Sequence, residues 1–388
     1  MIMSGVWFDG RAPYADVVIH GLVRDEKGHK MSKTKGNVID PLEMCDEYGA
    51  DAVRFTLAIL SGTGRDLPFG KTRVAGYRAF ATKVWNAARF ALGMLGEGKP
   101  EAETIDFASL GTVDRWILSR LSGAVAKVNA SLETYRFDEA ANALYAFFWS
   151  EFCDGYVEMV KPALRDEGAP EEDKAKTRAV LRRVLLDSLA MLHPFMPFVS
   201  CEIREALNGD GMTLPVARFP EADPAWDDPL AVSAVETIRA AATRIRNLRA
   251  ERGLAQTEAL AAGLEVAAGP VADELARHAP LLVYLARLSS LEVAPKVGLP
   301  GAFHDAIGAV GLVVSLPVKE LGSGERAKLE KELAQLEREV EGVKKRLSDD
   351  GFLSRAPAAV VEKNRKQLEE LEERRARLAG NLAPAGGR

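Results

Sequence analysis

Apolar residues recur at three- and four-residue steps along most of the chain, which predicts a mainly α-helical protein. The clearest run begins at position 113. It covers four amphipathic stretches at 113–132, 138–164, 174–192 and 197–207. Their short connections indicate a helical bundle. A fifth stretch at 229–253 completes it, and we expect the bundle to span 113–255.

Shorter helices precede the bundle, in a helical junction expected at 41–112. Asp40 and Pro41 supply a capping side chain and a first-turn proline for a helix at 41–48. Gly49 should end this helix in the left-handed conformation, and Asp51 should cap the next one. A third helix at 73–95 carries Trp85 and Phe90, which its periodicity places in the core.

Two further patterns follow the bundle. Strand-like runs at 260–266, 291–294 and 311–316, with a helix at 271–285, predict a small α/β module at 256–320. An a/d seam then runs through Glu325 to Leu378 and predicts an antiparallel coiled-coil hairpin at 321–380. A dimeric coiled coil is the alternative, but Gly351 and Pro357 at the midpoint favour a turn. Residues 381–388 lack an apolar pattern, and we expect them to be disordered.

One polar stretch interrupts these patterns. Lys30–Asn37 reads Lys-Met-Ser-Lys-Thr-Lys-Gly-Asn, and its ammonium groups and hydroxyls could surround a phosphate. A solvated lysine cluster is the alternative. The flanks favour phosphate, because a β-branched run at 16–20 predicts a buried strand before the loop and Asp40 starts a helix after it. Gly36 and Asn37 should let the loop turn tightly.

Composition narrows the classes of function. The net charge of -5 excludes a uniformly basic nucleic-acid binder, so any RNA contact must be local. The three cysteines, Cys45, Cys153 and Cys201, form no C-x-x-C pair, which predicts a reducing compartment and no zinc. The sequence shows neither a membrane span nor a secretory signal, and we expect a cytoplasmic protein.

Two local groups of basic residues could contact RNA. Arg239, Arg246 and Arg249 share one part of the stretch at 229–253 and could bind phosphates, although a solvated face paired with nearby glutamates is the alternative. The second group lies near the tip of the predicted hairpin and consists of Lys344, Lys345 and Arg346.

The segment Ile19–Phe55 resembles the second signature of class I aminoacyl-tRNA synthetases, in the form seen in valine–tRNA ligases. The family motif is KMSKS, and Thr34 keeps the hydroxyl of its last position. The resemblance implies that residues 1–40 are the C-terminal part of a Rossmann-type catalytic fold. It also implies that 113–255 is an anticodon-binding domain and that the hairpin binds tRNA. The hairpin favours valine over the isoleucine and methionine enzymes.

The resemblance implies ATP-dependent attachment of valine to tRNA(Val) through valyl-adenylate, by a monomer. Lys30 and Lys33 would be catalytic, and ATP would contact Lys30, Met31, Ser32, Lys33 and Thr34. Mg²⁺ would accompany ATP, and no residue cluster is predicted to bind a metal.

The first family signature, His-Ile-Gly-His, and the editing insertion do not occur in the sequence. We therefore expect a C-terminal portion that is inactive alone. Two alternatives remain open: a non-catalytic tRNA-binding fragment, and a sister ligase for isoleucine, leucine or methionine.

Overall fold

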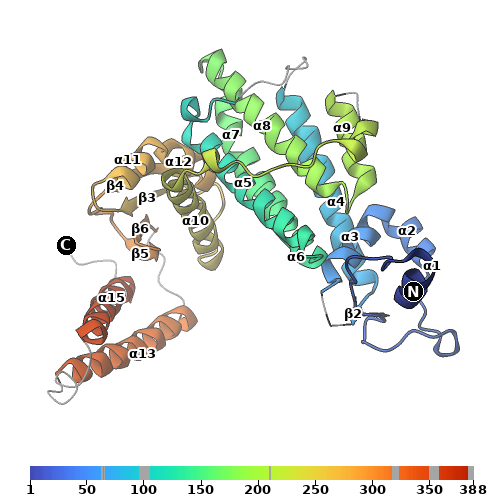
Figure 1. Ribbon diagram of the computed structural model, residues 1–388. Helices are drawn as coiled ribbons and strands as arrows, with labels where there is room; N and C mark the ends of the chain where they lie inside the picture. The colour runs from blue at the N-terminus through green and yellow to red at the C-terminus, as the bar shows by residue number, and fades with distance from the viewer. Residues whose placement is uncertain are drawn as a thin grey trace. The chain divides into compact units, whose positions relative to one another are not determined.

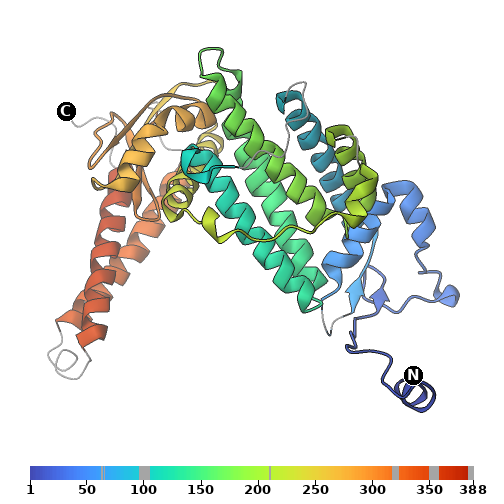
Figure 2. The same cartoon turned by 45° about the horizontal axis from the view of Figure 1, so that its top comes forward.

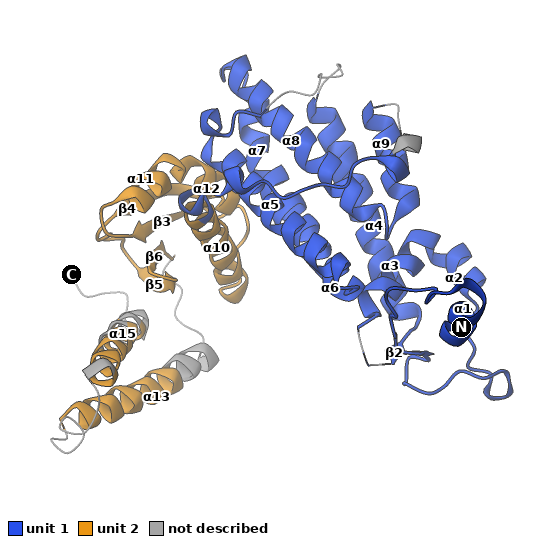
Figure 3. Ribbon diagram, in the orientation of Figure 1, with its two compact units in different colours: residues 1–232 blue, residues 233–388 orange. Residues whose placement is uncertain are grey.

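The computed structural model describes residues 1–62, 64, 66–95, 105–208, 211–316, 323–348 and 358–382. These residues are mostly helical, as predicted, with small sheets. The chain divides into two compact units, 1–232 and 233–388, and each is described by itself (Figure 3).

Unit 1 begins with a segment of short elements. They are α1 (Ile2–Asp9), β1 (Val23–Arg24), the 3-10 turn η1 (Lys33–Lys35), α2 (Pro41–Tyr48), α3 (Ala50–Leu60) and β2 (Leu67–Pro68). Strands β1 and β2 pair in parallel. The strand predicted at 16–20 is wrong, because this run pairs with no strand among the described residues and leaves Val17 70% and Ile19 79% exposed.

The rest of unit 1 is a bundle of long helices (Figure 1). It contains α4 (Lys71–Leu95), α5 (Thr112–Glu133), α6 (Phe137–Ala146), the π-helix η3 (Phe147–Tyr156), α7 (Val157–Arg165), α8 (Glu171–Leu192) and α9 (Pro197–Asn208). Short 3-10 turns are η2 (Phe107–Ser109), η4 (Gly211–Val216) and η5 (Pro224–Trp226). The periodic stretches therefore correspond to helices. The prediction that Trp85 lies in the core is wrong, because this side chain is exposed on α4.

A buried polar triad joins three helical elements of the bundle. Tyr156 donates its hydroxyl to one carboxylate oxygen of Asp114 at 2.5 Å, and Thr177 donates to the other oxygen at 2.9 Å. Burial raises the pKa of Asp114, although both hydroxyls oppose this shift. The triad thus satisfies a carboxylate that would otherwise be costly to bury.

Helix α3 is attached to the start of α9. Asp51 accepts hydrogen bonds from the amides of Phe198, at 3.2 Å, and Val199, at 2.7 Å. These are first-turn amides of α9, so Asp51 caps that helix and not its own, which corrects the prediction. Gly49 has φ 91° and ψ 142°, which is outside the left-handed helical conformation expected for it.

Unit 2 contains a four-stranded sheet packed on helices. Helix α10 (Pro229–Glu251) crosses the boundary between the units. The sheet order is β4-β3-β6-β5, with β3 and β4 parallel and the other pairs antiparallel. The remaining bounds are β3 (Leu260–Glu265), α11 (Pro270–Arg277), α12 (Ala279–Ala286), β4 (Leu288–Ala294), β5 (Ala302–Ile307) and β6 (Val310–Ser315).

Two features of this module differ from the prediction. Strand β5 was not predicted, because its residues Ala302–Ile307 do not alternate cleanly between apolar and polar. The single helix expected at 271–285 is two helices that meet at His278, where Pro280 fits the first turn of the second. Buried residues of α10, including Ile238 and Ile245, share one core with the sheet.

Helices α13 (Ser323–Leu347) and α15 (Ala358–Leu382) lie side by side (Figures 1 and 2). Leu336, Val340 and Val343 are buried along α13, as the a/d spacing requires. Two ion pairs connect the helices, Lys344–Glu372 at 2.5 Å and Arg374–Glu332 at 2.9 Å. The predicted turn at 348–357 falls outside the described residues except for Ser348. The disordered tail predicted at 381–388 is wrong at its start, because Asn381 and Leu382 belong to α15, and the rest of the tail falls outside the described residues.

We expect Asp114→Ala to lower the free energy of unfolding of unit 1 by about 2–4 kcal/mol, because two buried hydroxyls lose the carboxylate they share. All five tryptophans lie within residues 1–232, so urea unfolding followed by tryptophan fluorescence reports on this unit. The control is Asp227→Ala, at an exposed position, which should change the value by less than about 0.5 kcal/mol. Equal effects of the two substitutions would contradict the role of the triad.

Candidate nucleotide-binding loop and RNA-contact residues

The lysine-rich loop is a defined turn. Its residues Lys33–Lys35 form η1, and Ser32 precedes it in an extended conformation. The amide of Lys35 donates to the Ser32 hydroxyl at 3.3 Å and to its carbonyl oxygen at 3.1 Å. Gly36 ends the turn at φ 65°, a left-handed conformation that favours glycine. Hydrogen bonds to Ser32 and the left-handed Gly36 therefore define the backbone of this turn.

Asn37 closes the loop from the opposite side. Its side-chain amide oxygen accepts a hydrogen bond from the backbone amide of Ser32 at 2.9 Å. Its side-chain nitrogen donates to Asp25 at 2.9 Å and to the Lys30 carbonyl at 3.3 Å. One side chain thus ties both ends of the loop to the preceding turn, in agreement with the tight turn expected at Gly36 and Asn37.

Asp25 anchors that preceding turn. Its other oxygen accepts from the amides of Lys27, at 3.1 Å, and His29, at 2.7 Å. The hydrogen bond from Asn37, followed by that from the His29 amide, lowers the pKa of Asp25. The loop is joined in this way to β1, whose Arg24 forms an ion pair with Asp66 beside β2.

The loop presents cations to solvent. Lys30, Lys33, Thr34 and Lys35 are exposed, whereas Met31 and Ser32 are partly buried. No carboxylate in the described part of the chain forms an ion pair with these three lysines. Three ammonium groups and a hydroxyl on a fixed turn can bind a polyanion such as a triphosphate.

The arginines of α10 differ from the expected RNA-binding face. Arg249 is only 4% exposed, and its guanidinium donates to the backbone carbonyls of Glu258, Ala286 and Arg287, at 2.6, 3.1 and 2.8 Å. It is therefore unavailable to RNA, which corrects the prediction. The cause is that this end of α10 is covered by the loop after it and by the end of α12.

The other two arginines of that group have partners as well. Arg239 forms two hydrogen bonds with Glu236, both at 3.0 Å. Arg246 donates to the carbonyl of Leu285 at 3.1 Å and remains exposed. The three arginines therefore do not form one free basic surface, and only Arg246 keeps an exposed guanidinium bound to a single carbonyl.

The basic group near the end of α13 is partly paired. Lys344 is held by Glu372 of α15, whereas Lys345 and Arg346 are exposed. All three lie in the last turn of the helix, where cations also interact favourably with the helix dipole. Two cations are thus presented to solvent at this end.

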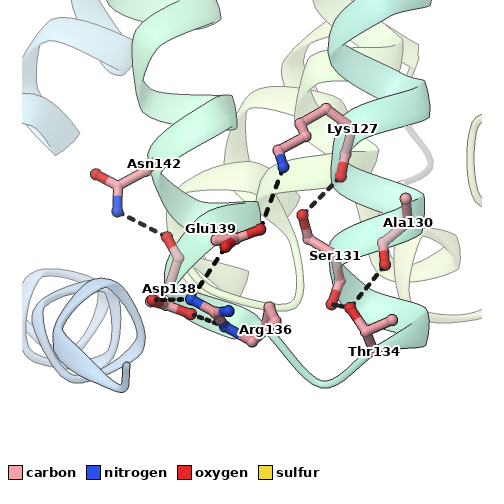
Figure 4. A network of polar contacts seen from close by, with 8 residues as sticks. All are labelled: Lys127, Ala130, Ser131, Thr134, Arg136, Asp138, Glu139 and Asn142. Atoms are coloured by element: carbon pink, nitrogen blue, oxygen red, sulfur yellow. Dashed lines mark hydrogen bonds and ion pairs between the residues drawn. The ribbon is translucent and has the colours of Figure 1, made fainter. Parts of the chain in front are cut away.

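One polar network was not predicted. At the corner between α5 and α6, Arg136 contacts Asp138 at 3.2 Å and Glu139 at 3.0 Å, and Glu139 also contacts Lys127 at 3.2 Å (Figure 4). Tyr135 precedes it at φ 58°, and its hydroxyl donates to Asp16 at 3.1 Å. The acidic pair at the start of a helix was the available signal.

The described residues form neither a metal site nor a disulfide. The described residues contain no cluster of three or more histidine, cysteine or acidic side chains that could hold a metal, and all three cysteines are free. Burial raises the pKa of Cys153 to about 12, so this thiol is unreactive at neutral pH. No helix in the described ranges has the length and apolar character needed to cross a membrane.

Three family profiles match separate parts of the chain. Residues 1–70 match tRNA synthetases class I (I, L, M and V). Residues 114–265 match the anticodon-binding domain of tRNA ligase. Residues 323–384 match the valyl tRNA synthetase tRNA binding arm. Together with the turn at Lys33–Lys35, these matches define the C-terminal part of a class I aminoacyl-tRNA synthetase.

The curated relatives indicate which member of this class the chain resembles. The chain is 41% identical over 377 residues to the valine–tRNA ligase of Syntrophotalea carbinolica, and 41% identical over 390 residues to that of Geobacter sulfurreducens. The matches cover 96% and 98% of this chain but only 42% and 43% of the relatives. The chain belongs to the valine–tRNA ligase family and spans less than half the length of these relatives.

Solved structures match less extensively. A LeuRS–tRNA–LeuAMS complex from Agrobacterium radiobacter K84 aligns at TM-score 0.46 and 21% identity, over 58% of this chain and 26% of that chain. A methionyl-tRNA synthetase from Mycobacterium tuberculosis aligns at TM-score 0.44 and 20% identity, over 52% and 40%. At such scores the alignments add nothing to the family assignment.

We expect Arg249→Ala to destabilise unit 2, because three backbone carbonyls lose a buried cationic donor. The free energy of the local unfolding that exposes the amides of β3 to exchange should fall by about 2 kcal/mol or more. Hydrogen exchange of peptides from β3 and α12 measures this, and tryptophan fluorescence of unit 1 should not change. The matched control is Arg246→Ala, with little effect on exchange. If Arg249→Ala left exchange unaltered, the structural role of its guanidinium would be refuted.

Proposed function

We propose that the chain is the C-terminal part of an enzyme that attaches valine to tRNA(Val) with ATP. The observation that carries this proposal is the closed loop at Lys30–Asn37, whose lysines are exposed and carry no ion pair to a described carboxylate, within a chain of the valine–tRNA ligase family. In the first step the valine carboxylate attacks the α-phosphorus of ATP, which gives valyl-adenylate and pyrophosphate. In the second the terminal ribose hydroxyl of the tRNA takes the valyl group and AMP leaves.

The loop would act electrostatically in the first step. Negative charge grows on the bridging oxygen and on the pyrophosphate as the bond breaks, and Lys33 and Lys30 would be the cations that stabilise it. Ser32 and Thr34 would supply hydroxyl donors, while Met31, which is partly buried, would contact ATP from the base of the loop. Mg²⁺ would arrive bound to the ATP phosphates, and no zinc is required.

The remaining parts would bind tRNA. The profile matches support an anticodon-binding bundle and a tRNA-binding arm. We propose that α13 and α15 form an antiparallel coiled-coil hairpin within one chain, because the ion pairs Lys344–Glu372 and Arg374–Glu332 join them. The enzyme is proposed to act as a cytoplasmic monomer. Contact with RNA would come from Arg246, Lys345 and Arg346, with Arg239 and Lys344 freed only if their acidic partners are displaced.

A second function is a tRNA-binding fragment without catalysis. The observation that favours it is that two of the three profile matches are to an anticodon-binding domain and to a tRNA-binding arm. ATP–pyrophosphate exchange separates the two functions. The sister-ligase alternative is weaker, because the curated relatives at about 40% identity are valine–tRNA ligases.

We expect Lys33→Ala to slow valyl-adenylate formation by about 10²-fold or more, a loss typical of removing one transition-state donor. The test protein is a chimera in which this chain replaces the matching region of the Geobacter sulfurreducens relative. Pre-steady-state adenylation is measured together with valine affinity, which should not change. Lys35→Ala is the matched control, with a smaller effect. Unaltered adenylation in Lys33→Ala would refute the phosphate-binding role.

A second prediction concerns the end of α13. In the same chimera, Lys345→Ala/Arg346→Ala should reduce the log–log salt slope of tRNA binding by roughly 1–2 units, because each lost phosphate contact removes somewhat less than one unit. The control, Lys331→Ala/Arg338→Ala, removes two exposed cations elsewhere on the same helix. Adenylation should survive in both, as it should after deletion of 325–378. Equal slopes for the two variants would make the arm a spacer only.

A further inference from the structure

An extended segment crosses the surface of the helical bundle in unit 1. Residues 217–228, which we call the strap, run across α5 between η4 and α10 (Figures 1 and 2). Their one regular element is the short turn η5. Among these residues, all of which the structure describes, only Pro220 and Trp226 are buried. The strap is therefore attached to the bundle at few points.

One face of α5 supplies most of the attachment. Ser119, Ser122 and Asn129 lie three and seven residues apart, which places their side chains on the same face of the helix. They donate hydrogen bonds to the backbone carbonyls at positions 226, 223 and 220 of the strap, the last two at 2.9 and 3.0 Å. The order is reversed, so the strap runs antiparallel to α5 and is held by successive side-chain donors.

Asp228 fixes the end of the strap. It forms an ion pair with Arg115 of α5 at 2.8 Å, and its amide donates to the Ser119 hydroxyl at 3.1 Å. Its carboxylate also accepts from the Ala231 amide at 2.9 Å, so Asp228 caps the start of α10. One residue thus connects α5 to a helix that shares its core with the sheet of unit 2.

The strap has the features of an extended peptide ligand. Its aromatic anchor is Trp226, which is 7% exposed and has the guanidinium of Arg183, on α8, 5.1 Å from its ring centre. Prolines at positions 220, 224 and 229 restrict the backbone even when the strap is detached. Less conformational entropy is therefore lost when the strap binds α5.

The strap can detach while the bundle stays folded. The hydrogen bonds that α5 donates to it come from side chains and are only partly buried, so the helices keep their own backbone hydrogen bonds when these break. Segments with few buried contacts open locally at low free energy. A detached strap adds up to about 40 Å of extended chain before α10.

We propose that the strap is a latch that sets the length of free chain between the bundle and α10, and thereby the affinity for tRNA. The attached strap leaves no slack before α10, whereas the detached strap is a flexible linker. Two RNA-binding parts on a short connection have a higher effective concentration for one RNA than the same parts on a long one. This inference rests on the proposed function, in which both the bundle and the arm bind tRNA.

Hydrogen exchange in the full 388-residue chain tests the latch without RNA. Ser122→Ala/Asn129→Ala removes two donors and should raise the exchange rates of the amides of Trp226 and Asp228 about tenfold or more (tenfold is about 1.4 kcal/mol). Peptides from α8 should exchange as before. Small-angle X-ray scattering should show a larger radius of gyration, because the connection before α10 is longer.

Two further variants complete this experiment. Trp226→Ala removes the anchor by a different route and should raise exchange at Asp228 in the same way. The matched control is Asn142→Ala, on α6, where the side chain is exposed and donates to the carbonyl of Asp138 in its own helix. This control should leave the exchange of the strap unchanged. Circular dichroism checks that every variant folds.

Binding of tRNA(Val) in a salt titration tests the consequence. Both strap variants should lower the affinity about threefold or more and leave the log–log salt slope unchanged, because no phosphate contact is lost. Unaltered exchange of the strap in both variants overturns the proposal, and so does faster exchange with unchanged affinity. A changed salt slope also overturns it, because the strap would then affect contacts to phosphates.

The two kinds of measurement separate this inference from the proposed function. If the chain does not bind tRNA, but the variants raise both the exchange rates and the radius of gyration, the release of the strap stands and the proposed RNA binding fails. If the chain binds tRNA and the variants change neither exchange nor affinity, only the latch fails.

Discussion

A buried carboxylate attaches the loop-bearing segment to the helical bundle. Asp51 lies on α3, a short chain distance after the loop, and it caps α9 through two amides almost 150 residues away. Burial raises the pKa of Asp51, while the two amides and the nearby Arg54 oppose this shift. Arg54 adds hydrogen bonds to the carbonyls of Pro194 and Phe195. This junction helps to fix the position of α3, together with the packing of its buried Phe55 against Phe80 of α4.

The loop itself is held by a different kind of interaction. Its shape comes from hydrogen bonds of Asn37, Asp25 and Ser32, and its lysines are exposed. These hydrogen bonds are exposed or only partly buried, and hydrogen bonds that water can compete for contribute little to stability. A loop built in this way keeps a preferred turn yet can open at low cost. That property suits the proposed function, in which the loop closes on a phosphate and then releases the product.

The sequence predicted what depends on local pattern. Helix periodicity located the bundle, the Asp40–Pro41 pair located the start of α2, and the motif located the turn at Lys33. The errors arose where a distant partner decides the outcome. Asp51 caps a helix that begins at Pro197, and Arg249 is buried by α12 and the loop before β3. The run at 16–20 has strand propensity, but it lacks a neighbour among the described residues.

The charge distribution constrains how such a chain can bind RNA. With a net charge of -5, long-range attraction to a phosphate backbone is absent, so binding must rely on short-range contacts. Two arginines already have partners within the chain. Arg249 donates to backbone carbonyls, and Arg244 forms ion pairs with Asp305 and Glu251. Arg244 and Arg249 are therefore not free to bind RNA, whereas Lys345 and Arg346 are exposed. In the proposed RNA complex, these exposed cations would decide where contacts to the phosphate backbone form, and such contacts carry no sequence information.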